Sequence, residues 1–474
     1  MKFDKINIYH ILLLGLILRI VFMIWGAPIY YGTPDYAAKG GDTHAWAMSM
    51  QNLVHHGTYS ADLNYPDGKF FRPPGYPFFL MPFYIGSGFN LGIAFKLAQI
   101  AQVLLDTLSI FLIFSLITFH RGSRNLALLG AFLYCIYPFA IVWSPYLYAE
   151  TPGIFFLLLA LYFLFNPEQQ LKTILAGILL GFSVLLRVQI IFVAPALLIY
   201  FWIEYGNFKL LFNRRLILFF LAFGLTYGSW PLRNLCYGKF IPAEEIVNDK
   251  HFSKDFVAYM FYIWSVKTDY NPQYDQIIRG QKVDWPSASY LHNGDSIKLE
   301  ALAKKCFTCG RGFSYWKASE KIIDQPITEN NKCTEEIAAT FDELRKQQIK
   351  NNPLNFYLLV PLSNLKKALF KFTLYGEKSF VVKLASSLLF SYRTIFIFLG
   401  LIGIWINKKH PLISNNFLVF IFIFFAFWYL TLCFGYRNIE IRYFLINDVL
   451  LLIPASISIV FLLEKIGLKI NFKN

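Results

Sequence analysis

The sequence predicts an all-α polytopic membrane protein, and two observations support this fold class. Hydrophobic residues make up 56% of the 474 residues and the mean hydropathy is +0.46, which is far more apolar than an ordinary soluble enzyme. Long apolar runs also recur along the chain, with short basic segments between them. Because such runs cross a bilayer as helices, we expect about ten spanning helices.

The net charge of +15 reflects 44 Lys and Arg against 29 Asp and Glu. Basic residues beside apolar runs set membrane topology and attract anionic lipid. No RNA- or DNA-binding motif accompanies the charge. We therefore expect the lipid bilayer, and not nucleic acid, as a partner.

The first apolar run, residues 9–29, follows Lys2 and Lys5. It is too long for a removable signal peptide and lacks a small-residue cleavage site, so we expect a retained helix with a cytoplasmic N-terminus. The next loop is then outside. Arg19 lies in the middle of this run and needs a partner on a neighbouring helix, which indicates a structural role.

Residues 77–95 are apolar but interrupted by Pro and Gly, so we expect a surface or re-entrant element there. Six spans follow, at 97–118, 125–143, 152–166, 173–186, 190–205 and 215–231. With this assignment the short basic segments between spans, which include Arg121, Arg124 and Lys209, are cytoplasmic. If 77–95 were counted as a span, these basic segments would fall on the outer side, against the positive-inside rule.

Residues 1–234 thus form an N-terminal transmembrane module, and residues 235–354 form a polar, charge-balanced outer loop or small domain. Residues 355–474 begin with an amphipathic segment, 355–380, which contains Lys366, Lys367 and Lys371 and lies at the membrane interface. Spans at 386–406, 412–434 and 443–464 complete the chain. The tail, with Lys465, Lys469 and Lys473, is cytoplasmic.

The first outer loop, residues 30–77, contains a short amphipathic helix. Asp42 stands at the N-cap position and Gly57 at the C-terminal glycine position of a helix over 43–56. Fourteen residues at about 1.5 Å each cannot cross about 30 Å of hydrocarbon. We therefore expect this helix to lie along the membrane surface.

The Gly41-Asp42 pair, this helix and the turn Arg72-Pro-Pro-Gly-Tyr-Pro77 resemble the bacterial family 39-type glycosyltransferases. These enzymes are related to protein mannosyltransferases and to the lipid A aminoarabinose transferase, in the GT-C superfamily. Further similar segments follow in the family's order, at 148–151, 186–187, 230–234 and 442–443. The stretch from about 240 to 385 resembles nothing in the family. The resemblance implies a GT-C-like bundle of ten to thirteen transmembrane helices.

Six charged residues fall at outer helix ends or in outer loops: Asp42, Arg72, Glu150, Arg187, Arg233 and Arg442. Charges at membrane depth are costly, so they face a cavity, pair with one another or bind a substrate. The chemistry that fits is transfer of a sugar from a polyprenyl-phosphate carrier to an acceptor hydroxyl. A carboxylate takes the acceptor's proton, and arginines hold the departing phosphate.

The match to the family's first-loop acid implies that Asp42 is the general base of an inverting transfer. A plain N-cap carboxylate is the alternative, and the two roles are compatible. Glu150 is the second catalytic candidate and would orient the acceptor or bind a metal. Its alternative is a cap on the helix that begins at Thr151.

The resemblance implies that Arg72 contacts the donor phosphate, and an interfacial arginine that snorkels is the alternative. Arg187, Arg233 and Arg442 are donor phosphate candidates with the same alternative. Tyr76 and His44 are candidates for substrate binding.

Three histidines, His44, His55 and His56, flank the surface helix near Asp42 and Glu150. No His-x-x-x-His or comparable spacing supports a metal site, which favours ordinary surface histidines. We therefore assign no metal ligand and no certain cofactor. A divalent metal ion is left open, because some relatives bind one.

Cys306, Cys309 and Cys333 lie in the outer region, where oxidation is expected. We predict one disulfide that joins Cys333 to Cys306 or Cys309, with Cys236 as a partner for the cysteine left over. A zinc site of these thiolates is the alternative. Cys135 and Cys433 lie in predicted helices and are expected to be packing residues.

The sequence therefore predicts a multi-pass glycosyltransferase of the bacterial inner membrane with its active site on the periplasmic face. The acceptor would be a glycolipid, an envelope polysaccharide or a secreted protein. A transporter or flippase of lipid-linked sugars is the alternative, although the internal repeat of many transporters is absent. An O-antigen ligase or polymerase is a second enzyme alternative, which the order of the motifs disfavours.

Overall fold

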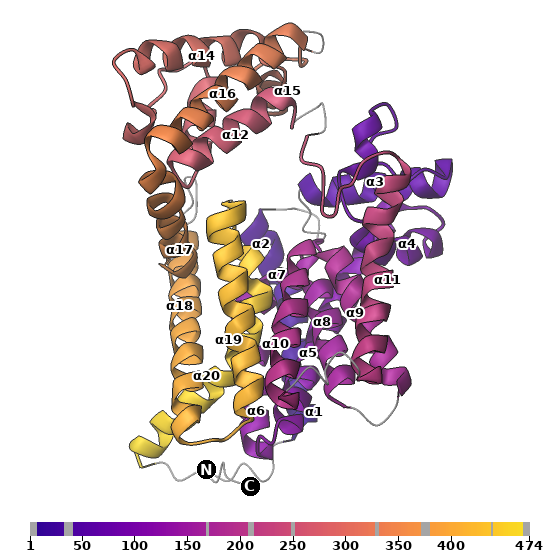
Figure 1. The fold of residues 1–474 in the computed structure, drawn as a ribbon. Helices are drawn as coiled ribbons and strands as arrows, with labels where there is room; N and C mark the ends of the chain where they lie inside the picture. Colours follow the sequence, from indigo (N-terminus) through magenta and orange to yellow (C-terminus); the bar gives the residue numbers. More distant parts are fainter. Residues whose placement is uncertain are drawn as a thin grey trace.

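The computed structural model describes residues 7–32, 41–166, 170–206, 213–247, 252–327, 331–370, 380–437 and 439–467. Within these ranges the chain is built of helices and contains no strand (Figure 1). Several basic residues named in the sequence analysis lie outside the described ranges: Lys2, Lys5, Lys209, Lys371, Lys469 and Lys473. The all-α fold class is confirmed.

Seven helical segments of the described chain are long and apolar enough to cross a membrane: Ile8–Tyr31, Leu91–Phe119, Val188–Tyr205, Arg214–Cys236, Phe380–Lys409, Asn415–Tyr436 and Ile441–Lys465. Three shorter apolar helices pack among them: Arg124–Cys135, Glu150–Phe165 and Gln170–Leu186. Each of these elements overlaps one predicted span. The chain is thus a polytopic membrane protein.

The N-terminal half of the bundle consists of α1 (Ile8–Val21), η2 (Phe22–Gly26), α2 (Ala27–Tyr31), α5 (Leu91–Phe119), α6 (Arg124–Cys135), α7 (Pro138–Trp143), α8 (Glu150–Phe165), α9 (Gln170–Leu186), η4 (Val188–Phe192), α10 (Val193–Tyr205) and α11 (Arg214–Cys236). The span predicted at 125–143 is broken between α6 and α7. Pro138 explains the break, because proline supplies no N–H and starts a new helix.

The C-terminal half comprises η7 (Asn355–Leu359), α17 (Val360–Phe370), α18 (Phe380–Lys409), α19 (Asn415–Leu430), η8 (Thr431–Tyr436), η9 (Ile441–Phe444) and α20 (Leu445–Lys465). In α20, every residue from Leu445 to Ser458 is buried in the bundle core, whereas its last turn is not. Figure 1 shows the start of α1, the end of α20 and the turn between α18 and α19 at the same end of the bundle.

The first outer loop forms α3 (Gly41–His56), η3 (Pro66–Phe70) and α4 (Gly75–Gly86) at the opposite end. The sequence predicted Asp42 at the N-cap of this helix. Helix α3 instead begins at Gly41, so Asp42 lies in its first turn. Gly57 ends the helix with φ +65°, as predicted. Helix α4 is too short to span a bilayer. Its length agrees with the prediction of a surface or re-entrant element at 77–95.

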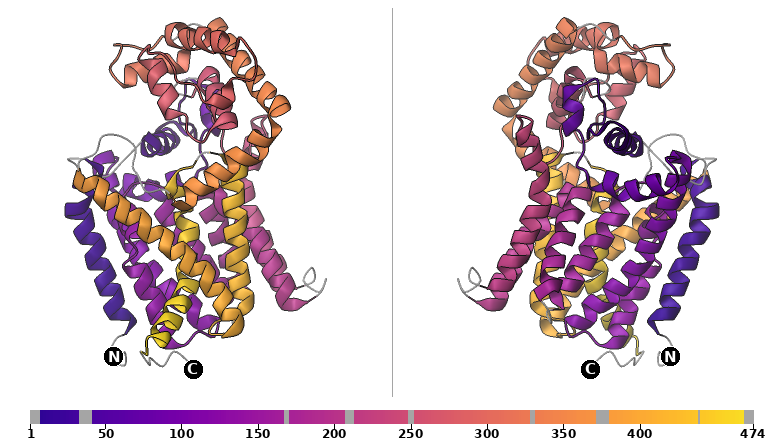
Figure 2. Two further views of the ribbon diagram at one scale, coloured as in Figure 1. Left: turned by 90° about the vertical axis from the view of Figure 1, so that its left-hand side faces the viewer. Right: turned by 90° about the vertical axis from the view of Figure 1, so that its right-hand side faces the viewer.

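Residues 254–351 form a helical outer domain with its own hydrophobic core. Its helices are α12 (Lys254–Val266), α13 (Asn271–Ile278), η6 (Ser287–Ser289), α14 (Asp295–Cys309), α15 (Arg311–Ser319) and α16 (Asn331–Asn351). Figure 2 shows this domain above the α3 region, on the side away from the bundle. The sequence predicted an outer loop or small domain at 235–354, and its helical structure was not predicted.

A disulfide joins Cys309 of α14 to Cys333 of α16, which confirms one of the two predicted pairings. Cys306 is free because its side chain is buried in the core of the outer domain. Cys236 is also free, at the end of α11, so the predicted second pairing is wrong. Cys135 and Cys433 are buried packing residues, as expected.

Two buried ion pairs join helices inside the bundle. The Nε of Arg19 donates to Asp106 over 2.5 Å, and the hydroxyl of Tyr134 also donates to Asp106. This confirms that Arg19 is paired with a neighbouring helix. Arg393 of α18 forms a second pair with Asp448 of α20, also at 2.5 Å. A lone charge at these positions would be strongly unfavourable, because neither water nor another charge would compensate it.

We expect Arg393→Met to destabilise the protein by about 3–5 kcal/mol, because it leaves Asp448 buried without its partner. The double variant Arg393→Met/Asp448→Leu removes both charges and should recover most of this loss. Thermal unfolding in detergent compares the two variants. A double variant that unfolds at the same temperature as the single one would contradict this account of the pair.

Candidate active site

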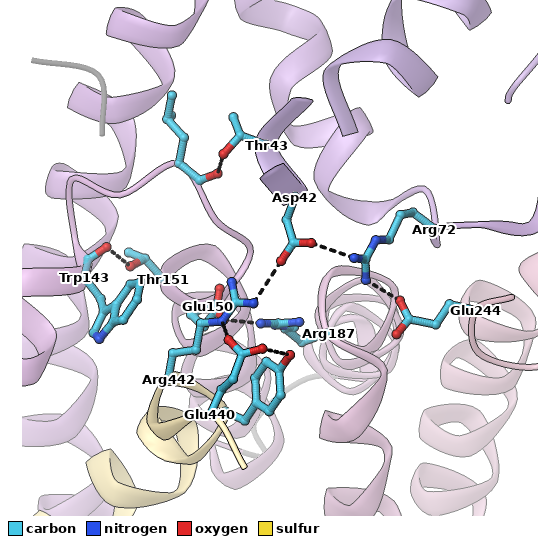
Figure 3. Close-up of polar contacts among 12 residues, drawn as sticks. Asp42, Thr43, Arg72, Trp143, Glu150, Thr151, Arg187, Glu244, Glu440 and Arg442 are labelled. Carbon is cyan, nitrogen blue, oxygen red and sulfur yellow. Dashed lines mark hydrogen bonds and ion pairs between the residues drawn. The ribbon is translucent and has the colours of Figure 1, made fainter. Parts of the chain in front are cut away.

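Charged side chains from distant parts of the chain meet at the head of the bundle, below the outer domain (Figure 3). Asp42 comes from α3, Arg72 from the turn before α4, Glu150 from the first residue of α8, and Arg187 from the junction of α9 and η4. Arg442 comes from η9. The structure thus brings together five of the six charged residues singled out in the sequence.

The turn containing Arg72 reaches the cluster because Gly75 permits a close approach. A Cβ atom at Gly75 would lie only 2.3 Å from the carbonyl carbon of Leu185, near the end of α9. The Arg-Pro-Pro-Gly segment therefore packs directly on the backbone that leads into Arg187. The hydroxyl of Tyr59 donates to the carbonyl oxygen of Arg72 over 2.8 Å and fixes this turn.

Asp42 lies between two arginines. The Nη2 of Arg72 donates to its Oδ1 over 2.6 Å, and the Nη2 of Arg442 donates to its Oδ2 over 2.9 Å. Burial favours a higher pKa for Asp42, but Arg72, Arg442 and Arg187 outweigh it and hold the pKa well below its ordinary value. Asp42 is therefore an ionised carboxylate at neutral pH.

Arg72 also binds Glu244, through Nη1 to Oε2 at 2.5 Å. Glu244 belongs to the strap, residues 239–247, which follows α11. Two hydrogen bonds fix the strap near Glu244: Glu245 N donates to Phe70 O over 2.9 Å, and Trp230 Nε1 donates to Ala243 O over 2.7 Å. Arg72 is thus shared between the carboxylates of Asp42 and Glu244.

Glu150 is almost completely buried, with 1% of its surface exposed. Its Oε1 accepts a hydrogen bond from Arg187 and lies 3.7 Å from the Nε of Arg442. Its Oε2 has no hydrogen-bond partner within the described part of the chain. Glu150 therefore orients two arginines and retains one oxygen for a further donor.

Arg442 connects the cluster to the loop before α20. Its Nε donates to Glu440 over 2.6 Å, and its guanidinium stacks over the ring of Tyr148 at 4.3 Å. The hydroxyl of Tyr443 donates to the other oxygen of Glu440 over 2.8 Å. Burial favours a higher pKa for Glu440, but Arg442 outweighs it and lowers the pKa.

Two predicted residues do not join the cluster. Arg233 donates to the carbonyl oxygens of Lys69 at 2.6 Å and Tyr59 at 2.9 Å, so it braces the first outer loop and is not placed to bind a phosphate there. Tyr76 is fully buried and donates to Gln102 over 2.7 Å, so it packs the loop and is not placed to touch a substrate. A helix-end position in the sequence does not fix the direction of a side chain.

The histidines near the surface helix do not gather at one point. His55 bonds the hydroxyl of Tyr84 at 2.8 Å, whereas His44 lies on the exposed face of α3. Among the residues that the structure describes, no three His, Cys, Asp or Glu side chains come close enough to hold a metal ion. Both oxygens of Asp42 instead face guanidinium groups, an arrangement that does not fit a dication.

Two cavities meet at Arg72. The outer cavity, of about 570 Å³, lies between α3 and the outer domain and is lined by Gly41, Asp42, His44, Ala45, Met48, Ala61, Asp62, Gly68, Phe71, Arg72, Tyr148, Phe252, Tyr315, Trp316, Ser319 and Arg442. The arginine cavity, of about 230 Å³, is lined by Trp46, Arg72, Pro73, Leu186, Arg187, Val188, Gln189, Ile191, Phe192, Ala243, Glu244, Ile246, Thr431, Leu432 and Tyr436. Asp42 borders the outer cavity, and Arg187 borders the arginine cavity.

Sequence reasoning missed Glu244 and Glu440 as members of the site. Glu440 stands in the Glu-Ile-Arg-Tyr segment and was available from its place beside Arg442. Glu244 lies in a stretch that resembles no known family, and nothing in its sequence surroundings distinguishes it from other surface acids. Its role is visible only because the strap returns to Arg72.

The chain is similar to known proteins in one segment of its sequence and in its fold. Residues 73–230 match the dolichyl-phosphate-mannose-protein mannosyltransferase family. The fold is similar to that of the oligosaccharyltransferase AglB from Archaeoglobus fulgidus, solved with an inhibitory peptide and a dolichol-phosphate, at 14% identity, 99% coverage of this chain, 52% coverage of that chain and a TM-score of 0.50. The chain spans about half the length of AglB. No curated protein sequence matches the chain.

A second AglB structure, tethered to an acceptor peptide, gives a TM-score of 0.54 at 14% identity, with 99% of this chain and 52% of that chain covered. ArnT from Cupriavidus metallidurans, in the apo state, is 12% identical with a TM-score of 0.35, covering 93% of this chain and 77% of that chain. The fold and the family match confirm the resemblance to GT-C membrane glycosyltransferases. Within that class, residues 73–230 are similar to the dolichyl-phosphate-mannose-protein mannosyltransferases.

The depressed pKa of Asp42 predicts how its contribution to stability depends on pH. Because the folded-state pKa lies below the ordinary value of 3.8, the contribution is complete above about pH 4 and is lost as the pH falls through the folded-state pKa. The difference in melting temperature between the native protein and Asp42→Asn should therefore stay constant from about pH 7 to pH 5 and shrink only below about pH 4. A difference that already shrinks between pH 7 and pH 5 would mean that burial outweighs the arginines.

Proposed function

We propose that the protein transfers a sugar from a polyprenyl-phosphate carrier to an acceptor hydroxyl at the outer face of a bacterial inner membrane. One observation carries the proposal: an ionised carboxylate, Asp42, is held between Arg72 and Arg442 where two cavities meet. The acceptor class is a glycolipid, an envelope polysaccharide or a secreted protein.

The orientation of the chain in the membrane supports an outer site. The turn between α18 and α19 follows Lys408 and Lys409, and it lies at the end of the bundle away from the charged cluster (Figure 1). Arg121 and Arg124 flank the turn between α5 and α6. Because short basic loops stay in the cytoplasm, both termini are cytoplasmic and the cluster faces the periplasm.

The arginine cavity suits the carrier phosphate. Arg72 and Arg187 line it together with apolar side chains such as Phe192. Guanidinium groups bind phosphate in bidentate fashion, and they stabilise the negative charge that develops on it as the bond to the sugar breaks. The apolar lining suits the first part of the polyprenyl chain.

Asp42 is then the base for an acceptor in the outer cavity. The acceptor oxygen attacks the anomeric carbon, its proton passes to Asp42, and the bond between the anomeric carbon and the phosphate oxygen breaks. Because acceptor and phosphate approach from two different cavities, a direct displacement with inversion follows. A donor phosphate also competes with Asp42 for Arg72, which raises the basicity of the carboxylate as the substrate binds.

Glu150 is a positioning residue in this scheme. It binds Arg187 and lies beside Arg442, so it orients the guanidinium group that lines the arginine cavity and one of the two that hold Asp42. Its partnerless Oε2 is available to a hydroxyl of the transferred sugar. Loss of its charge would let both arginines change direction.

We expect Asp42→Asn to lower sugar transfer by about 10²–10⁴-fold, because an amide cannot accept the proton. Transfer is measured with a radiolabelled polyprenyl-phosphate sugar in membranes that contain equal amounts of each variant. The matched control is Asp67→Asn, which removes a carboxylate of the same loop that pairs with Lys239 on the surface.

Transfer that persists in Asp42→Asn would rule out the assigned base. If instead the lipid-linked sugar crosses the bilayer in a protein-dependent way without any transfer, the chain is a transporter.

We expect Glu244→Gln to lower KM for the donor roughly three- to tenfold, because phosphate would no longer compete with this carboxylate for Arg72. Arg187→Gln should raise the same KM at least as much. The control is Glu245→Gln, whose carboxylate accepts a hydrogen bond from the Val247 amide over 3.4 Å. A higher KM in Glu244→Gln would show that Glu244 holds Arg72 in place for the phosphate.

A further inference from the structure

One wall of the outer cavity is the exposed stripe of α3. Gly41, His44, Ala45 and Met48 line the cavity at i, i+3, i+4 and i+7, which is one face of a helix. The opposite face of α3, with Trp46 and Met50, is buried against α4. The orientation of α3 is therefore fixed by packing, and the face with His44 and Met48 is left to the cavity.

The other wall comes from the outer domain. Phe252, Tyr315 and Trp316 line the cavity, together with the exposed Ser319 at the end of α15. The Trp316 ring packs at 5.9 Å on Phe256 in the domain core and at 5.8 Å on Tyr315. These rings are thus held in place by the core of the domain while part of their surface borders the cavity.

The floor of the cavity is the catalytic cluster, because Asp42, Tyr148 and Arg442 also line it. Any molecule that fills the space between the two walls therefore places a group beside the Asp42 carboxylate. The volume of about 570 Å³ falls in the range of about 300–1,000 Å³ that is usual for sites of small ligands.

We infer that the outer cavity is an acceptor site for a carbohydrate, with Tyr315 and Trp316 as its specificity-determining residues. This inference rests on the proposed function. Aromatic rings pack on the apolar C–H faces of pyranoses, and short polar side chains such as His44, Asp62 and Ser319 bind hydroxyl groups. A lipid tail would need an uncharged lining, whereas Asp42, Asp62, Arg72 and Arg442 also line this cavity.

Binding tests this inference separately from transfer. Saturation-transfer NMR on the purified full chain uses trisaccharides of glucose, mannose, galactose or N-acetylglucosamine, and a decapeptide rich in Ser and Thr. We expect at least one trisaccharide to bind and the peptide not to bind. Tyr315→Ala should weaken this binding roughly five- to tenfold, and Trp316→Phe, which keeps a ring, should weaken it less.

Two further variants complete the test. Ser319→Leu should block binding, because a bulkier side chain at an exposed position fills the cavity mouth without disturbing the core. Tyr290→Ala removes an aromatic side chain that is 46% exposed on the same domain and lies outside the cavity lining, so it should bind as the native chain does.

Three results would overturn the inference: binding of the peptide alone, no binding of any trisaccharide, or equal binding by the native chain, Tyr315→Ala and Ser319→Leu. The proposed function fails in a different way. If the trisaccharide binds and Tyr315→Ala weakens that binding, but no sugar is transferred from the polyprenyl phosphate, the cavity recognises a carbohydrate and the transferase assignment is wrong.

Discussion

The Asp42 carboxylate is the interaction on which the rest of the site depends. It binds arginines 30 and 400 residues away in the sequence. The first outer loop, the last outer loop and, through Glu244, the strap after α11 are therefore joined at one carboxylate (Figure 3). Both arginines on Asp42 are shared with further carboxylates, Arg72 with Glu244 and Arg442 with Glu440, so an anionic substrate would have to compete with these acids for the guanidinium groups.

Buried charges elsewhere in the bundle are also paired, but their pairs have a structural role. Arg19 with Asp106, and Arg393 with Asp448, form closed pairs that tie helices together. In the site, by contrast, Glu150 Oε2 and Arg442 Nη1 are buried without hydrogen-bond partners in the described chain. Closed pairs stabilise the fold, whereas a network with unused donors and acceptors beside two cavities is prepared for a ligand.

The outer domain completes this arrangement on the other side of the cavity. A disulfide and an aromatic core hold its helices together, and its α15 faces α3 across the outer cavity. The bundle supplies the acid and the arginines, and the outer domain supplies the aromatic wall. In the proposed function, the bundle would carry the chemistry and the outer domain would recognise the acceptor.

The sequence by itself determined the all-α membrane fold, the break after the first outer loop that keeps α4 short, and the candidates Asp42, Arg72, Glu150, Arg187 and Arg442. Apolar runs, proline breaks and basic loops act locally, so composition and spacing reveal them. Only the tertiary structure decided that Arg233 and Tyr76 turn away from the cluster, that Glu244 and Glu440 join it, and that Cys309 rather than Cys306 bonds Cys333. The physical reason is that side-chain partners depend on where distant segments meet, and a single sequence carries no local signal for that.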